Sequence, residues 1–258
     1  MSDLIRCPNC GSLETALTDV SSKKYRCHAC MSNFLLAEKK SNPKAGLATS
    51  PLSMPKSKEF FDKLMNKVVA LNVNFGGIVC AGTGFFISKE YLLTNAHVVL
   101  NGEGNCNISD FAIKIAGTNY WHNKLFFFDI IAADIQRDIA LLKAQREHDD
   151  FVTFSKNMYN GEPVYAIGNS RGEGLCILEG IISDVSRTVN SNKVFMTSAL
   201  VTKGNSGCPV FNAQGLLLGM ISEGSANSVA MNYGIPSSVL LEFIDKVEQS
   251  EEIKILER

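Results

Sequence analysis

Short apolar runs separated by turn-forming residues dominate the chain from about residue 68 to residue 236. Runs of this length, with Gly, Asn or Asp between them, are typical of β-strands joined by tight connections. Thirteen runs are predicted as strands: 68–73, 77–81, 85–88, 91–94, 111–115, 125–135, 139–143, 163–168, 175–185, 193–198, 209–211, 216–222 and 230–235. Their roughly regular recurrence indicates an all-β fold, arranged as barrels or as a sandwich.

A single amphipathic helix is expected after the last strand. Pro236 and the serines that follow it can open a helix over about 237–250. Its apolar residues fall on one face: Val239, Leu240, Phe243, Ile244 and Val247. We expect this face to pack against the preceding strands rather than against a membrane.

Composition and charge place the chain among globular proteins. Of its 258 residues 45% are hydrophobic and 20% are charged, which is enough for both a buried core and a charged surface. No apolar run approaches the roughly 18 to 20 residues that cross a bilayer, so no membrane association is expected. The first residues, MSDLIRC, lack the basic and apolar regions of a secretory signal. These features predict a cytoplasmic location.

Four of the eight cysteines form two pairs near the N-terminus. They are Cys7, Cys10, Cys27 and Cys30, with two residues inside each pair and sixteen between the pairs. Two CxxC pairs at this separation can supply four thiolates to one tetrahedral metal ion. Residues 1–38 are therefore predicted to be a zinc ribbon that holds one structural zinc ion. Iron is left open because it accepts the same ligands, and two disulfides would need an oxidising compartment.

A linker and a charge difference separate this ribbon from the rest of the chain. Residues 39–58 contain three prolines among Ser, Lys, Ala and Gly without apolar periodicity, as expected of a flexible linker. Residues 1–58 carry nine Lys and Arg against four Asp and Glu, whereas 59–258 carry sixteen against twenty-two. The basic ribbon could bind nucleic acid through Lys23, Lys24 and Arg26. A solvated basic face and a protein partner remain the alternatives.

Three segments among the predicted turns carry residues suited to nucleophilic catalysis. They are TNAHVV with His97, RDIALLK with Asp138, and KGNSGCPVF with Ser206. A serine hydroxyl needs a neighbouring base, and that base needs a third group to hold its tautomer. Glycines on both sides of Ser206 leave the backbone N–H groups open to a substrate oxygen. Each motif alone is common, but the three together are specific.

These three blocks resemble the catalytic blocks of the trypsin-like (chymotrypsin-fold) serine proteases. Among these they resemble most the bacterial HtrA/Deg type, here without a PDZ domain, over roughly residues 68–245. The resemblance implies two antiparallel six-stranded β-barrels followed by a C-terminal helix. Barrel one would span about 68–148 and barrel two about 150–236, within a protease domain of 59–258.

The same resemblance implies roles for individual residues. Ser206 would be the nucleophile, His97 the general base and Asp138 the residue that orients His97. The backbone N–H groups of Gly204 and Ser206 would form the oxyanion hole. The implied substrate-binding residues are Leu200, Ser222, Glu223, Gly224 and Met231, with Ser222 also supporting Asp138. Because Leu200 and Met231 are uncharged, we expect cleavage after a small or medium apolar residue.

Several positions depart from the pattern of secreted relatives. Asn205 stands where they carry Asp, so a freed N-terminus has no buried carboxylate to pair with. Cys208 replaces a glycine and is expected to add bulk near the nucleophile. His122 and His148 lie among polar residues and are expected at the surface. The sequence thus predicts an intracellular serine endopeptidase whose ribbon recruits a substrate or partner. The alternative is a protein with the protease fold but no catalytic activity, which acts as a binding or sensor module.

Overall fold

The structure is a computed structural model that describes residues 15–19, 24–29, 31, 33–35, 56–75, 78–100, 114–119, 124–224 and 232–256. The chain divides into two units, Met1–Pro55 and Lys56–Arg258. Three of the predicted zinc ligands (Cys7, Cys10 and Cys30), Met231, His122 and most of the predicted linker lie outside the described residues.

A three-stranded antiparallel sheet occupies the first unit. Its strands follow the chain in the order β1 (Thr15–Asp19), β2 (Lys24–Cys27) and β3 (Asn33–Leu35). Cys27 ends β2 opposite Thr15 on β1, and its side chain is buried.

The first half of the second unit is a closed six-stranded barrel, which we call barrel one. Around the barrel, the strands are β4 (Val68–Phe75), β5 (Ile78–Phe86), β6 (Tyr91–Thr94), β9 (Ile139–Ala144), β8 (Lys124–Asp134) and β7 (Lys114–Asn119). Large apolar residues such as Phe86, Leu92 and Phe126 fill its interior. Two of the predicted strands, 77–81 and 85–88, largely merge into the single strand β5.

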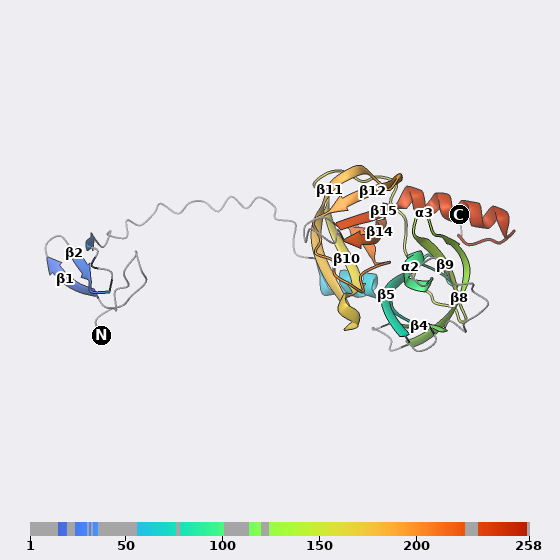
Figure 1. The fold of residues 1–258 in the computed structure, drawn as a ribbon, viewed down its shortest axis with the longest axis horizontal. Coiled ribbons are helices and arrows are strands. Elements are labelled where there is room, and N and C mark those ends of the chain that lie inside the picture. The colour runs from blue at the N-terminus through green and yellow to red at the C-terminus, as the bar shows by residue number, and fades with distance from the viewer. Residues whose placement is uncertain are drawn as a thin grey trace. The chain divides into compact units, whose positions relative to one another are not determined.

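A second closed six-stranded barrel, barrel two, follows. Its strands are β10 (Pro163–Asn169), β11 (Leu175–Val189), β12 (Asn192–Thr197), β15 (Asn232–Pro236), β14 (Leu217–Gly224) and β13 (Pro209–Asn212). All strand pairs in both barrels are antiparallel. The two barrels lie side by side (Figure 1). The prediction of two antiparallel six-stranded barrels is confirmed.

One helix precedes the barrel strands in sequence and another follows them. Helix α3 (Ser237–Ser250) begins directly after β15, as predicted, and buries its apolar face in the core that both barrels share. Helix α1 (Lys58–Met65) was not predicted. Its rings Phe60 and Phe61 pack edge-on against Tyr165 of barrel two, and the chain then enters barrel one. In the described residues, no helix has the length and apolar character needed to cross a membrane.

The surface position expected for His148 is wrong. Its side chain is only 4% exposed, and its Nε2 lies 2.8 Å from the carbonyl oxygen of Asn66. The ring also stacks on Phe86, with ring centroids 4.5 Å apart. The charged neighbours in sequence gave no sign of this burial, because the contacts come from distant residues: Asn66, which follows α1, Phe86 on β5 and Phe126 on β8.

Candidate active site

His97 and Asp138 meet because two paired strands carry them. Strands β6 and β9 are in register at Thr94 and Ala140. His97 lies in the one-turn helix α2 (Ala96–Val99), directly after β6, and Asp138 immediately precedes β9. The His97 Nδ1 lies 2.9 and 3.0 Å from the two carboxylate oxygens of Asp138. Because a carboxylate only accepts, Nδ1 carries the proton, which leaves Nε2 as the basic nitrogen.

The Asp138 carboxylate is held from two further sides. The backbone N–H of His97 donates to one oxygen at 3.0 Å, and the Ser222 hydroxyl donates to the other at 2.6 Å. Asp138 has a φ of +58°, a left-handed conformation that is uncommon outside glycine. The Asn95 side-chain amide donates to the Asp138 carbonyl oxygen at 2.9 Å. This bond from Asn95, which the sequence did not suggest, helps to hold the unusual backbone conformation.

Residues Thr202–Cys208, the Ser206 loop, contact barrel one near the end of β6. The backbone N–H of Thr83 in barrel one donates to the Ser206 carbonyl oxygen at 2.9 Å. Gly207 has a φ of +83°, and a Cβ built on it would lie 3.2 Å from the backbone nitrogen of Asn95. The loop therefore packs against the end of β6, two residues before His97. Three segments far apart in sequence converge between the barrels.

The carbonyl groups of the Ser206 loop fix the direction of two backbone N–H groups. Lys203 accepts a bond of 2.7 Å from the Arg171 N–H, and Asn205 accepts one of 2.9 Å from the Cys208 N–H. In a trans peptide the C=O and N–H point in opposite directions. The N–H groups of Gly204 and Ser206 therefore point away from these partners. No acceptor within the described part of the chain takes either of them.

Asn205, which precedes the serine, is held by neutral partners. Its side chain is fully buried, and its Oδ1 accepts a bond of 3.1 Å from the Ser170 hydroxyl. The loop is thus ordered without a buried ion pair at this position.

Three of the predicted substrate-binding residues, Ser222, Glu223 and Gly224, end strand β14 of barrel two. Strand β14 pairs with β13 only as far as Met220. In the described residues, Glu223 and Gly224 pair only with β15, and Ser222 lies at the register shift just before them. Leu200 is 59% exposed, which leaves its side chain open to a ligand.

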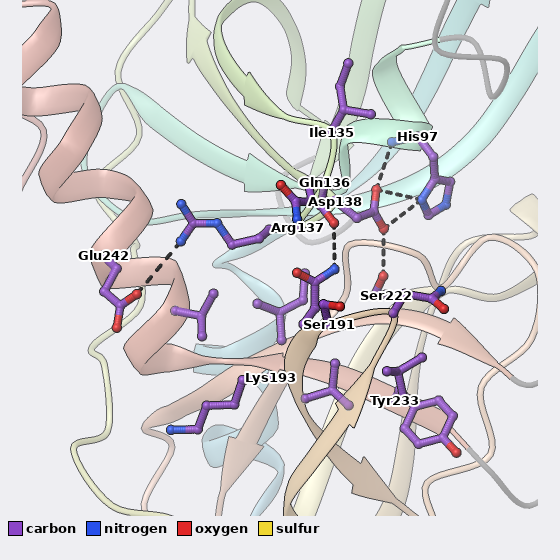
Figure 2. A pocket seen from close by; sticks show the side chains of 16 residues that line it. His97, Ile135, Gln136, Arg137, Asp138, Ser191, Lys193, Ser222, Tyr233 and Glu242 are labelled. Carbon is purple, nitrogen blue, oxygen red and sulfur yellow. Dashed lines mark hydrogen bonds and ion pairs between the residues drawn. The ribbon is translucent and has the colours of Figure 1, made fainter.

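A cleft of about 630 Å³ opens beside the His97–Asp138 pair. The residues that line it include His97, Asp138 and Ser222 together with Lys193, Tyr233 and Glu242 (Figure 2). The turn between β11 and β12 closes one side of this cleft, where the Asn192 side-chain amide donates to the Gln136 carbonyl oxygen at 2.6 Å.

Cys208 does not add bulk near the nucleophile, contrary to our expectation. Its side chain is fully buried in the core of barrel two, with Val164, Ala166 and Val210. Burial raises the pKa of the Cys208 thiol strongly. The thiol is therefore a small apolar core group, and it leaves the cleft open.

Known proteins resemble this chain in sequence. The family model described as trypsin-like peptidase domain matches residues 82–220. The periplasmic serine endoprotease DegP-like of Brucella suis biovar 1 (strain 1330) is 31% identical over 180 residues, which cover 66% of this chain and 33% of that protein. A protein of the same name from Pseudomonas fulva (strain 12-X) is 32% identical over 66% of this chain and 35% of its own length. The chain thus spans about a third of the length of these relatives.

Solved structures share the fold. The serine endoprotease from Yersinia pestis aligns with a TM-score of 0.64 at 23% identity, over 76% of this chain and 68% of that one. The HtrA-type protease AlgW, solved with a tripeptide, also gives 0.64 at 23% identity, over 76% and 65%.

The relatives overturn the predicted cytoplasmic, intracellular location. They are named periplasmic serine endoproteases. The prediction was wrong because it depended on the lack of a secretory signal in the first residues. The absence of a signal in these residues does not determine the compartment.

Proposed function

Because the chain belongs to the family of trypsin-like peptidase domains, we propose that it is a serine endopeptidase acting on protein or peptide substrates. One observation carries the proposal. The His97 imidazole is hydrogen-bonded to a carboxylate at Nδ1, while the Ser206 loop packs against the strand end that leads to His97. This supplies a base with a fixed tautomer beside a serine in a tight turn.

The proposed reaction begins with attack of the Ser206 hydroxyl on the scissile carbonyl carbon. His97 Nε2 takes the hydroxyl proton, and the Asp138 carboxylate stabilises the imidazolium. The N–H groups of Gly204 and Ser206 bind the oxyanion, a contribution typically worth about 10² to 10³ in rate for one donor. The imidazolium then protonates the leaving amine, and an acyl-enzyme forms. Water, activated by His97, hydrolyses the ester and regenerates the Ser206 hydroxyl.

The substrate would bind as an added strand along Ser222 to Gly224. The edge of β14 that faces away from β15 supports this proposal. Leu200, together with Met231, would favour a small or medium apolar side chain before the cleaved bond. Cleavage of a peptide library mainly after Lys or Arg would contradict this specificity.

The N-terminal unit would recruit a substrate or partner as a zinc ribbon. Cys7, Cys10, Cys27 and Cys30 would hold one zinc ion, which would supply structural stability and no catalytic step. The buried Cys27 thiol at the end of β2 fits a ligand position. Zinc measured on the purified full chain should be one ion per chain, and it should fall in a Cys27→Ser variant. Visible absorbance would instead indicate iron, and a chain without metal whose thiols resist alkylation would indicate disulfides.

The recruiting role is tested separately from metal binding. The full chain should capture its substrate or partner more strongly than a variant with Cys27→Ser. Titration with DNA or RNA at low salt distinguishes the nucleic-acid alternative, because phosphate contacts weaken steeply as salt rises. A flat titration would exclude that partner.

Labelling with a fluorophosphonate tests the catalytic proposal. The wild-type full chain should incorporate one probe per molecule, and Ser206→Ala and His97→Ala should incorporate none. Ser250→Ala, at the end of α3, is a control that removes a serine hydroxyl away from the site. Equal background labelling of wild type and Ser206→Ala would instead favour a catalytically silent binding module.

A further inference from the structure

Thr83 is a fully buried residue of β5 that makes four hydrogen bonds. Its N–H donates to the Ser206 carbonyl at 2.9 Å, and its hydroxyl donates to the Gly204 carbonyl at 2.8 Å. Its hydroxyl also accepts the Asn169 N–H at 2.9 Å, and its carbonyl accepts the Thr94 hydroxyl at 2.6 Å. One residue of barrel one thus bonds both to the Ser206 loop and to the end of β10.

The two bonds to the Ser206 loop enclose one peptide group. The Gly204 carbonyl precedes Asn205, and the Ser206 carbonyl follows it. The Asn205–Ser206 peptide therefore lies between two peptide groups that Thr83 holds in place. The N–H of that central peptide belongs to Ser206, and it is one of the two proposed oxyanion donors.

The bond from Asn169 connects Thr83 to the second donor. Asn169 begins the turn in which Arg171, at a φ of +58°, donates its N–H to the Lys203 carbonyl. That bond fixes the direction of the Gly204 N–H, as described above. The Thr83 hydroxyl donates to the loop and accepts from the turn. It therefore links the two at one atom, in addition to the direct bonds from Arg171 and Ser170 to the loop.

Glycine packing confirms how tightly Thr83 and the loop fit. A Cβ on Gly207 would lie 2.1 Å from the Thr83 carbonyl oxygen, and a Cβ on Gly204 would lie 2.2 Å from the Asn169 carbonyl oxygen. Both of these oxygens are backbone atoms, which cannot move away by a change of side-chain rotamer. The loop backbone at Gly204 and Gly207 therefore packs closely against the backbone of Asn169 and Thr83.

We propose that Thr83 is a positioning residue, whose hydroxyl sets both backbone N–H donors of the oxyanion hole. This inference rests on the proposed function of Ser206. A hydroxyl is required because it donates one bond and accepts another at the same atom. Valine has the same branched shape but leaves the Gly204 carbonyl and the Asn169 N–H without their buried partner, which favours a rearranged loop.

Thr83→Val and Thr83→Ser in the full chain separate the hydroxyl from the shape of the side chain. We expect the maximal rate of inactivation by the fluorophosphonate to fall about 10- to 100-fold in Thr83→Val, since the phosphoryl oxygen uses the same two N–H donors. The half-saturating probe concentration should stay within about twofold. Thr83→Ser should keep the rate within about threefold of wild type.

Ser237→Ala is the matched control for lost stability. It removes another buried hydroxyl, which donates to the Leu217 carbonyl at 2.6 Å far from the Ser206 loop. It should lower the melting temperature and leave the inactivation rate unchanged. If Thr83→Val does not fold, Thr83→Ala takes its place.

Hydrogen exchange of residues 202–208, measured by mass spectrometry, keeps the test independent of catalysis. We expect faster exchange in this segment for Thr83→Val and wild-type exchange for Thr83→Ser. A wild-type chain that is not labelled would contradict the proposed function, and the exchange result would then decide the role of Thr83 alone. Wild-type exchange together with a wild-type rate in Thr83→Val would overturn the inference.

Discussion

The hydroxyl of Ser222 donates a hydrogen bond of 2.6 Å to the carboxylate of Asp138, across 84 residues of sequence. Asp138 belongs to barrel one, and Ser222 lies on β14 of barrel two. The carboxylate that orients His97 is therefore held in part by the opposite barrel. The relative position of the two barrels enters directly into the geometry of the candidate catalytic residues.

Removal of this bond should slow catalysis without unfolding the chain. A hydrogen bond to a charged group is worth about 1.5 to 3 kcal/mol, and only part of this acts on the transition state. We expect Ser222→Ala to lower the maximal rate of fluorophosphonate inactivation roughly tenfold. Ser222→Thr should retain much of the rate, and Ser237→Ala should retain all of it. An unchanged rate in Ser222→Ala would show that His97 and the backbone N–H suffice to hold Asp138.

Two glycines with nearly the same φ separate backbone strain from packing. Gly207 has a φ of +83° and Gly161 a φ of +84°, but nothing lies within 4 Å of a Cβ on Gly161. Gly161→Ala should therefore cost only the conformational term, about 1 to 2 kcal/mol of unfolding free energy. Gly207→Ala should cost clearly more, because its Cβ would meet the Thr83 carbonyl, and should also abolish labelling. Urea unfolding of both variants measures the difference, and equal losses would contradict the packing argument.

Local patterns in the sequence predicted many of the strands well, whereas the two barrels were implied by the resemblance to the trypsin-like proteases. The strands β6, β9 and β10 occupy nearly the residues expected, because apolar runs bounded by turn residues depend on local chemistry. The positions of His97 and Asp138 relative to strands were also predictable from their motifs. His97 follows β6 and Asp138 precedes β9, and these two strands are neighbours.

What the sequence did not predict depends on contacts between distant segments. Asp138 adopts a positive φ, which Asp tolerates better than most residues. The bonds from Asn95 to its carbonyl and from Ser222 to its carboxylate come from distant segments. Cys208 points into the core beside Gly168. A Cβ added to Gly168 would lie only 2.8 Å from the Cβ of Cys208, so the glycine leaves room for the cysteine side chain. His148 is buried against strands β5 and β8 and the residue that follows α1. These outcomes follow from packing, which a local pattern does not encode.

Thiol reactivity should separate Cys208 from Cys80. The thiolate is the reactive form, and burial raises the pKa of Cys208 while its side chain is fully covered. Cys80 is exposed. Iodoacetamide applied to the folded chain should modify Cys80 at least about 100-fold faster than Cys208, and denaturant should remove the difference. Peptide mapping by mass spectrometry measures both sites, with Cys80→Ser as the control. Comparable rates in the folded chain would mean that the core around Cys208 opens readily.

The contact between α1 and barrel two should weaken at alkaline pH through Tyr165. Its ring is 8% exposed and packs against Phe60 and Phe61. Burial, and secondarily the Glu179 carboxylate, raises the pKa of Tyr165 above its usual value near 10. The folded chain thus keeps the phenol proton to higher pH than the unfolded chain does. This contribution to stability is complete below pH 10 and is lost as the pH rises through the raised value.

Tyr165→Phe has no proton to lose, so it tests this dependence directly. Between pH 9 and pH 11.5 the unfolding free energy of wild type should fall more steeply than that of Tyr165→Phe, as measured by urea unfolding at each pH. Tyr159→Phe is the control, because Tyr159 is 61% exposed, and it should reproduce the wild-type slope. Equal slopes in wild type and Tyr165→Phe would mean that the phenol ionises alike in the folded and unfolded chains. A steeper loss of unfolding free energy in wild type would instead show that the loss of stability at alkaline pH comes from ionisation of Tyr165.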